Sequence, residues 1–185
     1  MKVPPEILGI RTVARSRIFH VEAVQLRFEN GTECEFERIA APAVVGTVIV
    51  VAVPEPGSVL LVREYAVGLH RYELGLPMGL IEPGESVIEA ADRELREETG
   101  FSARVLVPLT TMSLAPGILS YQARIVLATD LVACHAQGDE PEAPELVTAS
   151  MADLTKWIAA EELTEARTLA ALFTASEYIR TGRRS

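Results

Sequence analysis

The segment from Ser86 to Gly100 constrains the fold more than any other part of this sequence, because its own residues mark where a helix begins and ends. The letters SVIE from residue 86 form a capping box, in which the serine hydroxyl accepts from the amide of Glu89 and the glutamate side chain accepts from the amide of Ser86. Gly100 stands where the chain needs a left-handed residue to leave the helix. Apolar residues recur between these ends at intervals of three and four, which gives the helix one face to pack on a sheet: Ile88, Ala91 and Leu95.

Upstream of this helix the sequence predicts mainly sheet. Residues 18–27 alternate apolar and polar side chains, Asn30-Gly31 is typical of a hairpin turn, and residues 32–39 return as a second strand. The β-branched run 43–53 predicts a buried strand, and a turn rich in proline leads from it into another strand at 59–64. A loop spaced by glycine and proline, 75–85, then leads into the helix.

Downstream, we expect two further strands, an acidic loop broken by proline, and two closing helices. The strands cover 104–113 and 121–131, and the loop covers 138–146. The helices cover 151–160 and 164–180, with Thr164 as the cap of the second.

This order of elements predicts an α+β fold, in which a mixed β-sheet is sandwiched between helices in an α/β/α arrangement. An antiparallel β-hairpin region precedes that sheet. We expect residues 1–42 to form this N-terminal β region, with a role in dimerisation and substrate contacts, and residues 43–185 to form the main domain.

Composition excludes several classes of protein. The formal net charge is −9, so the chain lacks the basic stripe that nucleic-acid backbones require. The longest apolar stretch, 40–53, is too short to span a bilayer. The N-terminus has no apolar core before a cleavage site, so we expect no signal peptide, no membrane partner and a cytoplasmic location. Cys34 and Cys134 are widely spaced and fit free thiols in a reducing compartment.

Three carboxylates on the predicted helix indicate metal chemistry. Glu94, Glu97 and Glu98 lie at i, i+3 and i+4, so they cluster on one side of the helix and repel one another. A divalent cation would relieve that repulsion, and Mg²⁺ prefers such hard oxygen ligands, often together with substrate phosphates. Taken alone, the three glutamates also fit a solvated acidic helix face.

The wider spacing decides between these interpretations. Five residues separate Gly79 from Glu85, and seven more separate Glu85 from Arg93-Glu94-Leu95. One residue then precedes Glu97-Glu98, and one more precedes Gly100-Phe101. This pattern matches the Nudix box, here residues 79–101, at every defined position, and so many fixed gaps are far more specific than a single glycine motif. The chain therefore resembles the Nudix hydrolases, and the resemblance reaches most of its length.

The resemblance implies a role for each box residue. Glu94 and Glu98 would ligate Mg²⁺, or Mn²⁺ or another divalent cation, with Glu97 nearby or also coordinating and the backbone carbonyl of Met78 as a further ligand. The implied reaction is the attack of a metal-activated water on a diphosphate that carries a nucleoside, with Glu97 and Glu98 as catalytic residues. Gly79 would support this site, and Glu85 and Arg93 would form a buried pair that ties the loop to the helix.

Segments outside the box resemble the NudE-like group of ADP-compounds hydrolases, within the ADP-ribose pyrophosphatase branch. They are RTVARSR, FERIAAP, VREYAVG, YELG with GLIEPGES, GDEPE and EARTLAALF. This resemblance implies hydrolysis of ADP-ribose, NADH and diadenosine polyphosphates, with release of AMP. An arginine that many ADP-ribose enzymes carry three residues beyond Arg63 is replaced by Ala66, which favours the broader group.

The implied substrate contacts lie outside the box. Arg38 of the FER segment would bind the diphosphate or the terminal ribose, although on its residues alone it also fits a surface arginine at a strand end. Arg63 and Glu64 are the next candidates. Pro116 lies sixteen residues after Gly100, a spacing that resembles ADP-ribose pyrophosphatases.

Relatives also use a glutamate from a mobile loop after the box, as catalytic base or extra ligand. In this sequence Glu140 and Glu142 are the candidates, and a solvated acidic loop is the alternative interpretation. Four aromatic residues can either stack an adenine or belong to the core: Phe28, Phe36, Tyr65 and Tyr121.

Two other functions stay open for this sequence. One is a Nudix pyrophosphatase that cleaves GDP-mannose or a nucleoside triphosphate, and the other is a nucleotide sensor without turnover. The intact box glutamates favour an enzyme over a sensor. Because relatives exchange N-terminal strands across a two-fold axis, the resemblance also implies a homodimer with Arg38 near the partner's site, and a small-molecule nucleotide rather than nucleic acid as the ligand.

Overall fold

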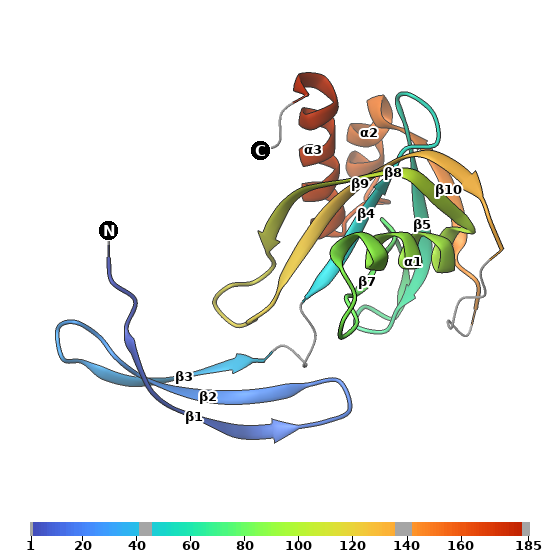
Figure 1. Cartoon of the computed structure of the whole chain (residues 1–185). Coiled ribbons are helices and arrows are strands. Elements are labelled where there is room, and N and C mark those ends of the chain that lie inside the picture. Colours follow the sequence, from blue (N-terminus) through green and yellow to red (C-terminus); the bar gives the residue numbers. More distant parts are fainter. Residues whose placement is uncertain (1, 41–45, 136–141, 183–185) are drawn as a thin grey trace.

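The computed structural model describes residues 2–40, 46–135 and 142–182, which form two β-sheets and three α-helices (Figure 1). The strands are β1 (Glu6–Arg15), β2 (His20–Arg27), β3 (Glu33–Ile39), β4 (Thr47–Ala52), β5 (Ser58–Ala66), β6 (Arg71–Gly75), β7 (Met78–Leu80), β8 (Phe101–Ser113), β9 (Gln122–Ala133) and β10 (Glu145–Ser150). The helices are α1 (Val87–Thr99), the 3₁₀ turn η1 (Met151–Asp153), α2 (Leu154–Ala159) and α3 (Ala166–Thr181).

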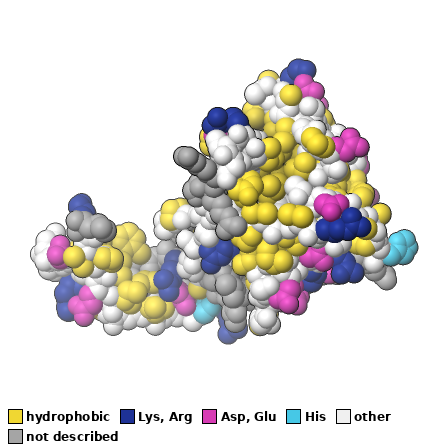
Figure 2. All heavy atoms as spheres, turned by 45° about the horizontal axis from the view of Figure 1, so that its top comes forward, with side chains coloured by type: hydrophobic (Ala, Val, Ile, Leu, Met, Phe, Trp, Pro, Cys, Tyr) yellow, Lys and Arg dark blue, Asp and Glu magenta, His cyan; other side chains and the backbone are white. Residues whose placement is uncertain are grey.

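Strands β1, β2 and β3 form an antiparallel sheet that projects from the rest of the chain (Figure 1). The predicted hairpin is confirmed, because β2 and β3 pair around Asn30-Gly31 and the Asn30 side chain accepts a hydrogen bond of 3.0 Å from the amide of Thr32. We call this sheet, residues 6–39, the arm. It exposes apolar side chains on two of its strands, namely Ile7, Ile10 and Val13 on β1 and Phe36 on β3. Figure 2 shows hydrophobic side chains on the surface of the arm.

The end of the arm is tied to the loop between β8 and β9. The Ile39 amide donates to the carbonyl of Ile118 at 2.7 Å, and the Ser120 amide donates to the carbonyl of Ile39 at 3.1 Å. Pro116 lies in the same loop, so the loop that carries this predicted substrate residue contacts the end of β3.

The main sheet runs in the order β10-β5-β4-β9-β8, with β6 paired to β5 and β7 paired to β4. Strand β4 is parallel to β9, whereas the other neighbouring strands are antiparallel, so the sheet is mixed as predicted. The run of β-branched residues in β4 is buried on both faces, which explains why it lacks the alternation of a strand with one wet face.

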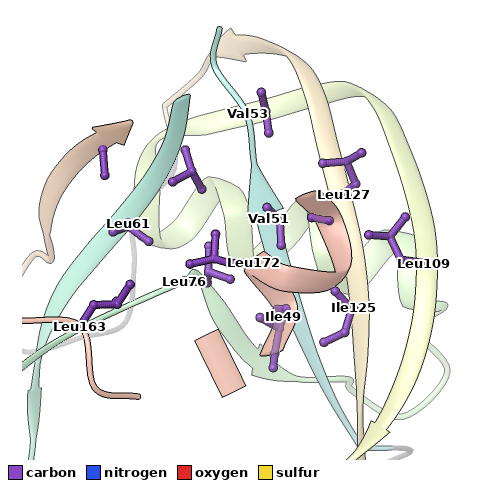
Figure 3. Packing of buried hydrophobic residues seen from close by; sticks show 14 of the residues in the cluster. Ile49, Val51, Val53, Leu61, Leu76, Leu109, Ile125, Leu127, Leu163 and Leu172 are labelled. Atoms are coloured by element: carbon purple, nitrogen blue, oxygen red, sulfur yellow. The ribbon is translucent and has the colours of Figure 1, made fainter. Parts of the chain in front are cut away.

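Helices cover both faces of this sheet, and β4 contributes alternate residues to the two cores. Ile49 and Val51 belong to the core beneath α3, where Leu172 packs (Figure 3). Val48 and Val50 belong to the core beneath α1. The predicted fold class is therefore confirmed. Among the helices that the structure describes, none has the length and apolar character needed to cross a bilayer.

Helix α1 begins and ends where the sequence predicts. Ser86 accepts from the amide of Glu89 at 3.2 Å, Glu89 accepts from the amide of Ser86 at 2.8 Å, and Gly100 has a left-handed φ of 72°. Ala91 and Leu95 are fully buried, and the small alanines let the helix backbone approach β4 closely. Truncating Leu95 to alanine at such a site costs about 2–5 kcal/mol.

Three expectations need correction. The expected loop 75–85 contains the short strand β7, and the expected loop 138–146 contains the start of β10 at Glu145, while residues 138–141 lie outside the described part of the chain. Thr164 was predicted to cap the last helix, but Glu165 is the cap and its side chain accepts from the amide of Thr168 at 2.7 Å. The hydroxyl of Thr164 donates instead to Glu73 at 3.0 Å, which ties α3 to β6.

Candidate active site

Strand β7, helix α1 and the loop between them carry most residues of the box, and Glu94 of α1 lies against Gly79 of β7. Glu94 is only 8 % exposed. A Cβ added to Gly79 would overlap the carboxylate carbon and both carboxylate oxygens of Glu94. A side chain at residue 79 would therefore displace this carboxylate, which occupies the space that a Cβ would take. Burial raises the pKa of Glu94, and the hydrogen bond from Arg93 opposes that shift.

Arg93 holds the carboxylates of this site in place. Its Nε and Nη2 donate to the two oxygens of Glu85 at 2.9 and 3.0 Å, and its Nη1 donates to Glu94 at 2.7 Å and Glu97 at 3.1 Å. Nη2 also donates to the carbonyl of Leu80 at 2.8 Å. The hydrogen bond from Arg93 is the main reason that the pKa of Glu85 is lowered. The loop after β7 and helix α1 are thus joined by one guanidinium.

Glu98 faces the start of β7, where one carboxylate oxygen accepts from the amide of Met78 at 3.2 Å. Within the described part of the chain, no three metal-binding side chains converge on one point. The reason is local, because Arg93 lies between Glu94 and Glu97. The donor set nevertheless fits a hard divalent cation, since it offers carboxylate oxygens on one side of a helix beside a backbone segment. A bound cation would compete with Arg93 for these oxygens.

A groove of about 550 Å³ extends from β7 to the beginning of α3. Gly79 and Met78 line one end, Glu64 lies along it, and Glu165 and Arg167 line the other end. Arg167 donates to Glu165 at 2.7 Å. Burial raises the pKa of Glu165, but the hydrogen bonds from Arg167 and from the Thr168 amide outweigh that effect and lower it.

A second hollow of about 560 Å³ adjoins this groove, because Glu64 and Tyr65 line both. Arg63 lies in its wall and pairs with Glu145 at 3.2 Å. The structure therefore brings together Arg63 and Glu64, which the sequence predicts as substrate contacts, with the end of the acidic loop. Glu142 lines the same hollow and accepts a hydrogen bond from Tyr72 at 2.6 Å. Glu140 lies outside the described residues.

Arg38 and Pro116 are not among the residues that line the groove or the second hollow. Arg38 lies on β3 in the arm, where it donates to Glu22 at 2.9 Å. Of the four aromatic candidates, Phe36 and Tyr65 are about half exposed and so do not belong to the core.

Sequence reasoning missed the residues that come from β6 and from the start of α3. Tyr72 and Glu73 lie on β6, which was not predicted as a strand, and they face β5 only because the two strands pair. Arg167 lies in the EARTLAALF segment, which indicated a resemblance but no role. These residues join the site through tertiary contacts, so no local sequence pattern identifies them.

The fold and the box geometry define a hydrolase of the Nudix class. The chain matches the NUDIX domain over residues 44–177 and the NudE-type Nudix hydrolase N-terminal domain over residues 5–38. It therefore belongs to the Nudix hydrolase family, in its NudE-type group.

Individual relatives agree with this placement. The chain is 44 % identical to the ADP compounds hydrolase NudE of Escherichia coli K12, covering 95 % of this chain and 94 % of that protein. It is 30 % identical to the ADP-ribose pyrophosphatase of Bacillus subtilis 168, covering 88 % and 90 %. The solved structure of an ADP compounds hydrolase superposes with a TM-score of 0.90 at 42 % identity, covering 100 % of this chain and 99 % of that one.

Proposed function

We propose that this protein hydrolyses the diphosphate bond of ADP-containing compounds such as ADP-ribose, NADH and diadenosine polyphosphates, releases AMP, and depends on Mg²⁺. The observation that carries this proposal is the buried Glu94 against Gly79, with Arg93 joining it to Glu85 and Glu97. The relatives that support the choice of substrate are an ADP compounds hydrolase and an ADP-ribose pyrophosphatase.

The metal would be held by Glu94 and Glu98, with Glu97 beside them and the carbonyl of Met78 as a further donor. A bound Mg²⁺ would supply an activated water and would stabilise the negative charge that develops on the phosphates. Side chains of the protein have the remaining roles. Arg93 orients Glu94 and Glu97, and Glu94 lies against Gly79, which lines the groove.

The substrate would occupy the groove and the adjoining hollow. Both Arg63 and Glu64 line that hollow, which supports the proposal that they contact the part of the substrate beyond the diphosphate. Glu142 is our candidate for the loop glutamate that accepts a proton, because it lines the same hollow, and Glu140 stays a sequence-based alternative.

We further propose a homodimer in which the arm of one subunit approaches the site of the other and supplies Arg38 and the exposed Phe36. The arm supports this in two ways. It exposes apolar side chains that a lone subunit leaves in water. In addition, residues 1–40, which include the arm, carry six basic and six acidic residues, so the whole charge of −9 lies on the remainder of the chain. Sedimentation at micromolar protein should give a dimer, and a 20.1 kDa monomer would contradict this part of the proposal.

A cytoplasmic location completes the proposal. Cys34, on β3, and Cys134, directly after β9, are both free thiols, which agrees with a reducing compartment.

The test of the proposed activity is the variant Glu98→Gln, which removes one negative oxygen while keeping the shape of the side chain. We expect turnover of ADP-ribose with Mg²⁺ to be nearly abolished while the melting temperature stays close to that of the parent protein. The matched control is Glu177→Gln, which alters a helix-surface glutamate on α3 far along the chain from the box. Near-normal turnover by Glu98→Gln would overturn the assignment of the metal site.

A further inference from the structure

Tyr65 and Tyr72 form an exposed aromatic pair beside the groove. They are directly opposite each other in the antiparallel pairing of β5 and β6. Their ring centroids are 5.8 Å apart and their planes meet at 70°. Both are about half exposed, at 49 % and 53 %, so neither ring is used to fill the core. A flat group that stacks on one ring would meet the edge of the other.

Hydrogen bonds at both hydroxyls fix the orientation of the two rings. The Tyr65 hydroxyl contacts Nδ1 of His70 at 2.5 Å, and the Tyr72 hydroxyl donates to Glu142 at 2.6 Å. His70 has a φ of 54°, in the left-handed region that a non-glycine residue rarely adopts, and that backbone turns its ring onto the edge of Tyr65. The pair is thus held in place before any ligand binds, which reduces the entropy lost on binding.

The position of the pair suits the distal end of a substrate whose diphosphate lies at the box. Tyr65 lines both the groove that begins at Gly79 and the second hollow, whereas Tyr72 lines the hollow. The hollow is also lined by Glu142 and Glu145, and Arg63 is already paired with Glu145. Carboxylates repel additional phosphates but accept hydrogen bonds from ribose hydroxyls, so the hollow favours an uncharged nucleoside.

We propose that Tyr65 and Tyr72 stack the base of the second nucleoside in dinucleotide substrates, the half that is not released as AMP. This inference rests on the proposed function. The proposal separates two parts of the substrate, because the diphosphate lies at the box and the second base meets the β5–β6 hairpin. Two stacking rings carry no hydrogen-bond code for a particular base, which explains how one site accepts more than one second nucleoside. ADP-ribose has no second base and makes no use of the pair.

The test compares substrates with and without a second base in the variants Tyr65→Leu and Tyr72→Leu. The quantity measured is kcat/KM for NADH and for diadenosine triphosphate, each divided by kcat/KM for ADP-ribose. Because stacking on an aromatic side chain is worth about 1–3 kcal/mol for each base, we expect each ratio to fall by roughly 5- to 150-fold. The dissociation constant of NADH divided by that of ADP-ribose, measured in the Glu98→Gln background, should rise by a similar factor.

Two variants serve as controls. Tyr72→Phe keeps the ring and removes the hydrogen bond to Glu142. Any loss of kcat/KM should therefore be equal for all substrates, and the ratios to ADP-ribose should stay at the values of the parent protein. Phe173→Leu changes an aromatic residue of α3 that is 71 % exposed, and it should leave the ratios unchanged. Unchanged ratios in both tyrosine-to-leucine variants, or an equal loss on ADP-ribose and the dinucleotides, would overturn the inference. Failure of the parent protein to hydrolyse any of these compounds with Mg²⁺ would overturn the proposed function itself.

Discussion

Replacing Gly79 with alanine tests whether the contact between β7 and α1 sets the geometry of the site. The added Cβ would overlap the carboxylate of Glu94, which is buried and cannot turn freely towards solvent. Non-bonded carbon and oxygen atoms keep about 3.5 Å apart, so the carboxylate would have to withdraw by about 1 Å or more. A displacement of about 1 Å lowers the rate by about 100-fold, and overpacking of a buried contact costs about 1–3 kcal/mol.

The assay is kcat/KM for ADP-ribose over a range of Mg²⁺ concentrations, together with thermal unfolding. For a chain of this size each kcal/mol lowers the melting temperature by about 2–4 °C. Gly68→Ala is the matched control, because nothing lies within 4 Å of an added Cβ there and its φ is outside the left-handed region. Normal activity of Gly79→Ala with unchanged Mg²⁺ dependence would refute the reasoning, because the carboxylate would then tolerate a displacement that the account excludes.

Two other changes probe the charges around the site. Arg93→Gln leaves the largely buried carboxylates of Glu85 and Glu94 without their partner, so unfolding by urea should show a loss of about 3 kcal/mol. Arg93→Lys should restore only part of this stability, because an ammonium cannot reproduce the bidentate contact. Equal stability of Arg93→Gln and the parent protein would contradict that role. Glu165→Gln should cost about 1 kcal/mol at pH 7, where the cap is charged. Because the folded pKa of Glu165 lies below its ordinary value of 4.5, this contribution is complete above pH 4.5 and is lost as the pH falls through the lower folded value. A difference between the two proteins that persists at lower pH would rule out the charge of Glu165 as its cause.

The parts of the structure that were predictable from the sequence are those whose stabilising contacts are local. The capping box of α1 joins residues three apart, and its terminal glycine acts through its own backbone, so both ends of this helix were found. Strands β6 and β7 have five and three residues, and each is a strand only because it pairs with β5 or β4. No local pattern shows that pairing.

The start of α3 shows the same limit at a single residue. Thr164 and Glu165 are both able to cap a helix, and the sequence does not choose between them. The choice is made by a contact across 91 residues, because the Thr164 hydroxyl is engaged by Glu73 and leaves the cap to Glu165.

The candidate site likewise has features that the sequence predicts and features that only tertiary contacts determine. The spacing of the box predicted which glutamates lie on one side of α1, but only the structure shows that Glu94 occupies the space beside Gly79. The contact of Tyr72 with Glu142 joins residues 70 apart and depends on the placement of β6 beside the acidic loop, so no sequence pattern predicted it.

The measurement that tests the central claim most directly is a substrate panel with Mg²⁺, scored by kcat/KM with identification of the products. The panel contains ADP-ribose, NADH, diadenosine triphosphate, GDP-mannose and nucleoside triphosphates. The account predicts that the three ADP-containing compounds are cleaved most efficiently, that each gives AMP, and that chelation of the metal stops the reaction. A higher kcat/KM for GDP-mannose or a nucleoside triphosphate, or turnover that survives chelation, would contradict it.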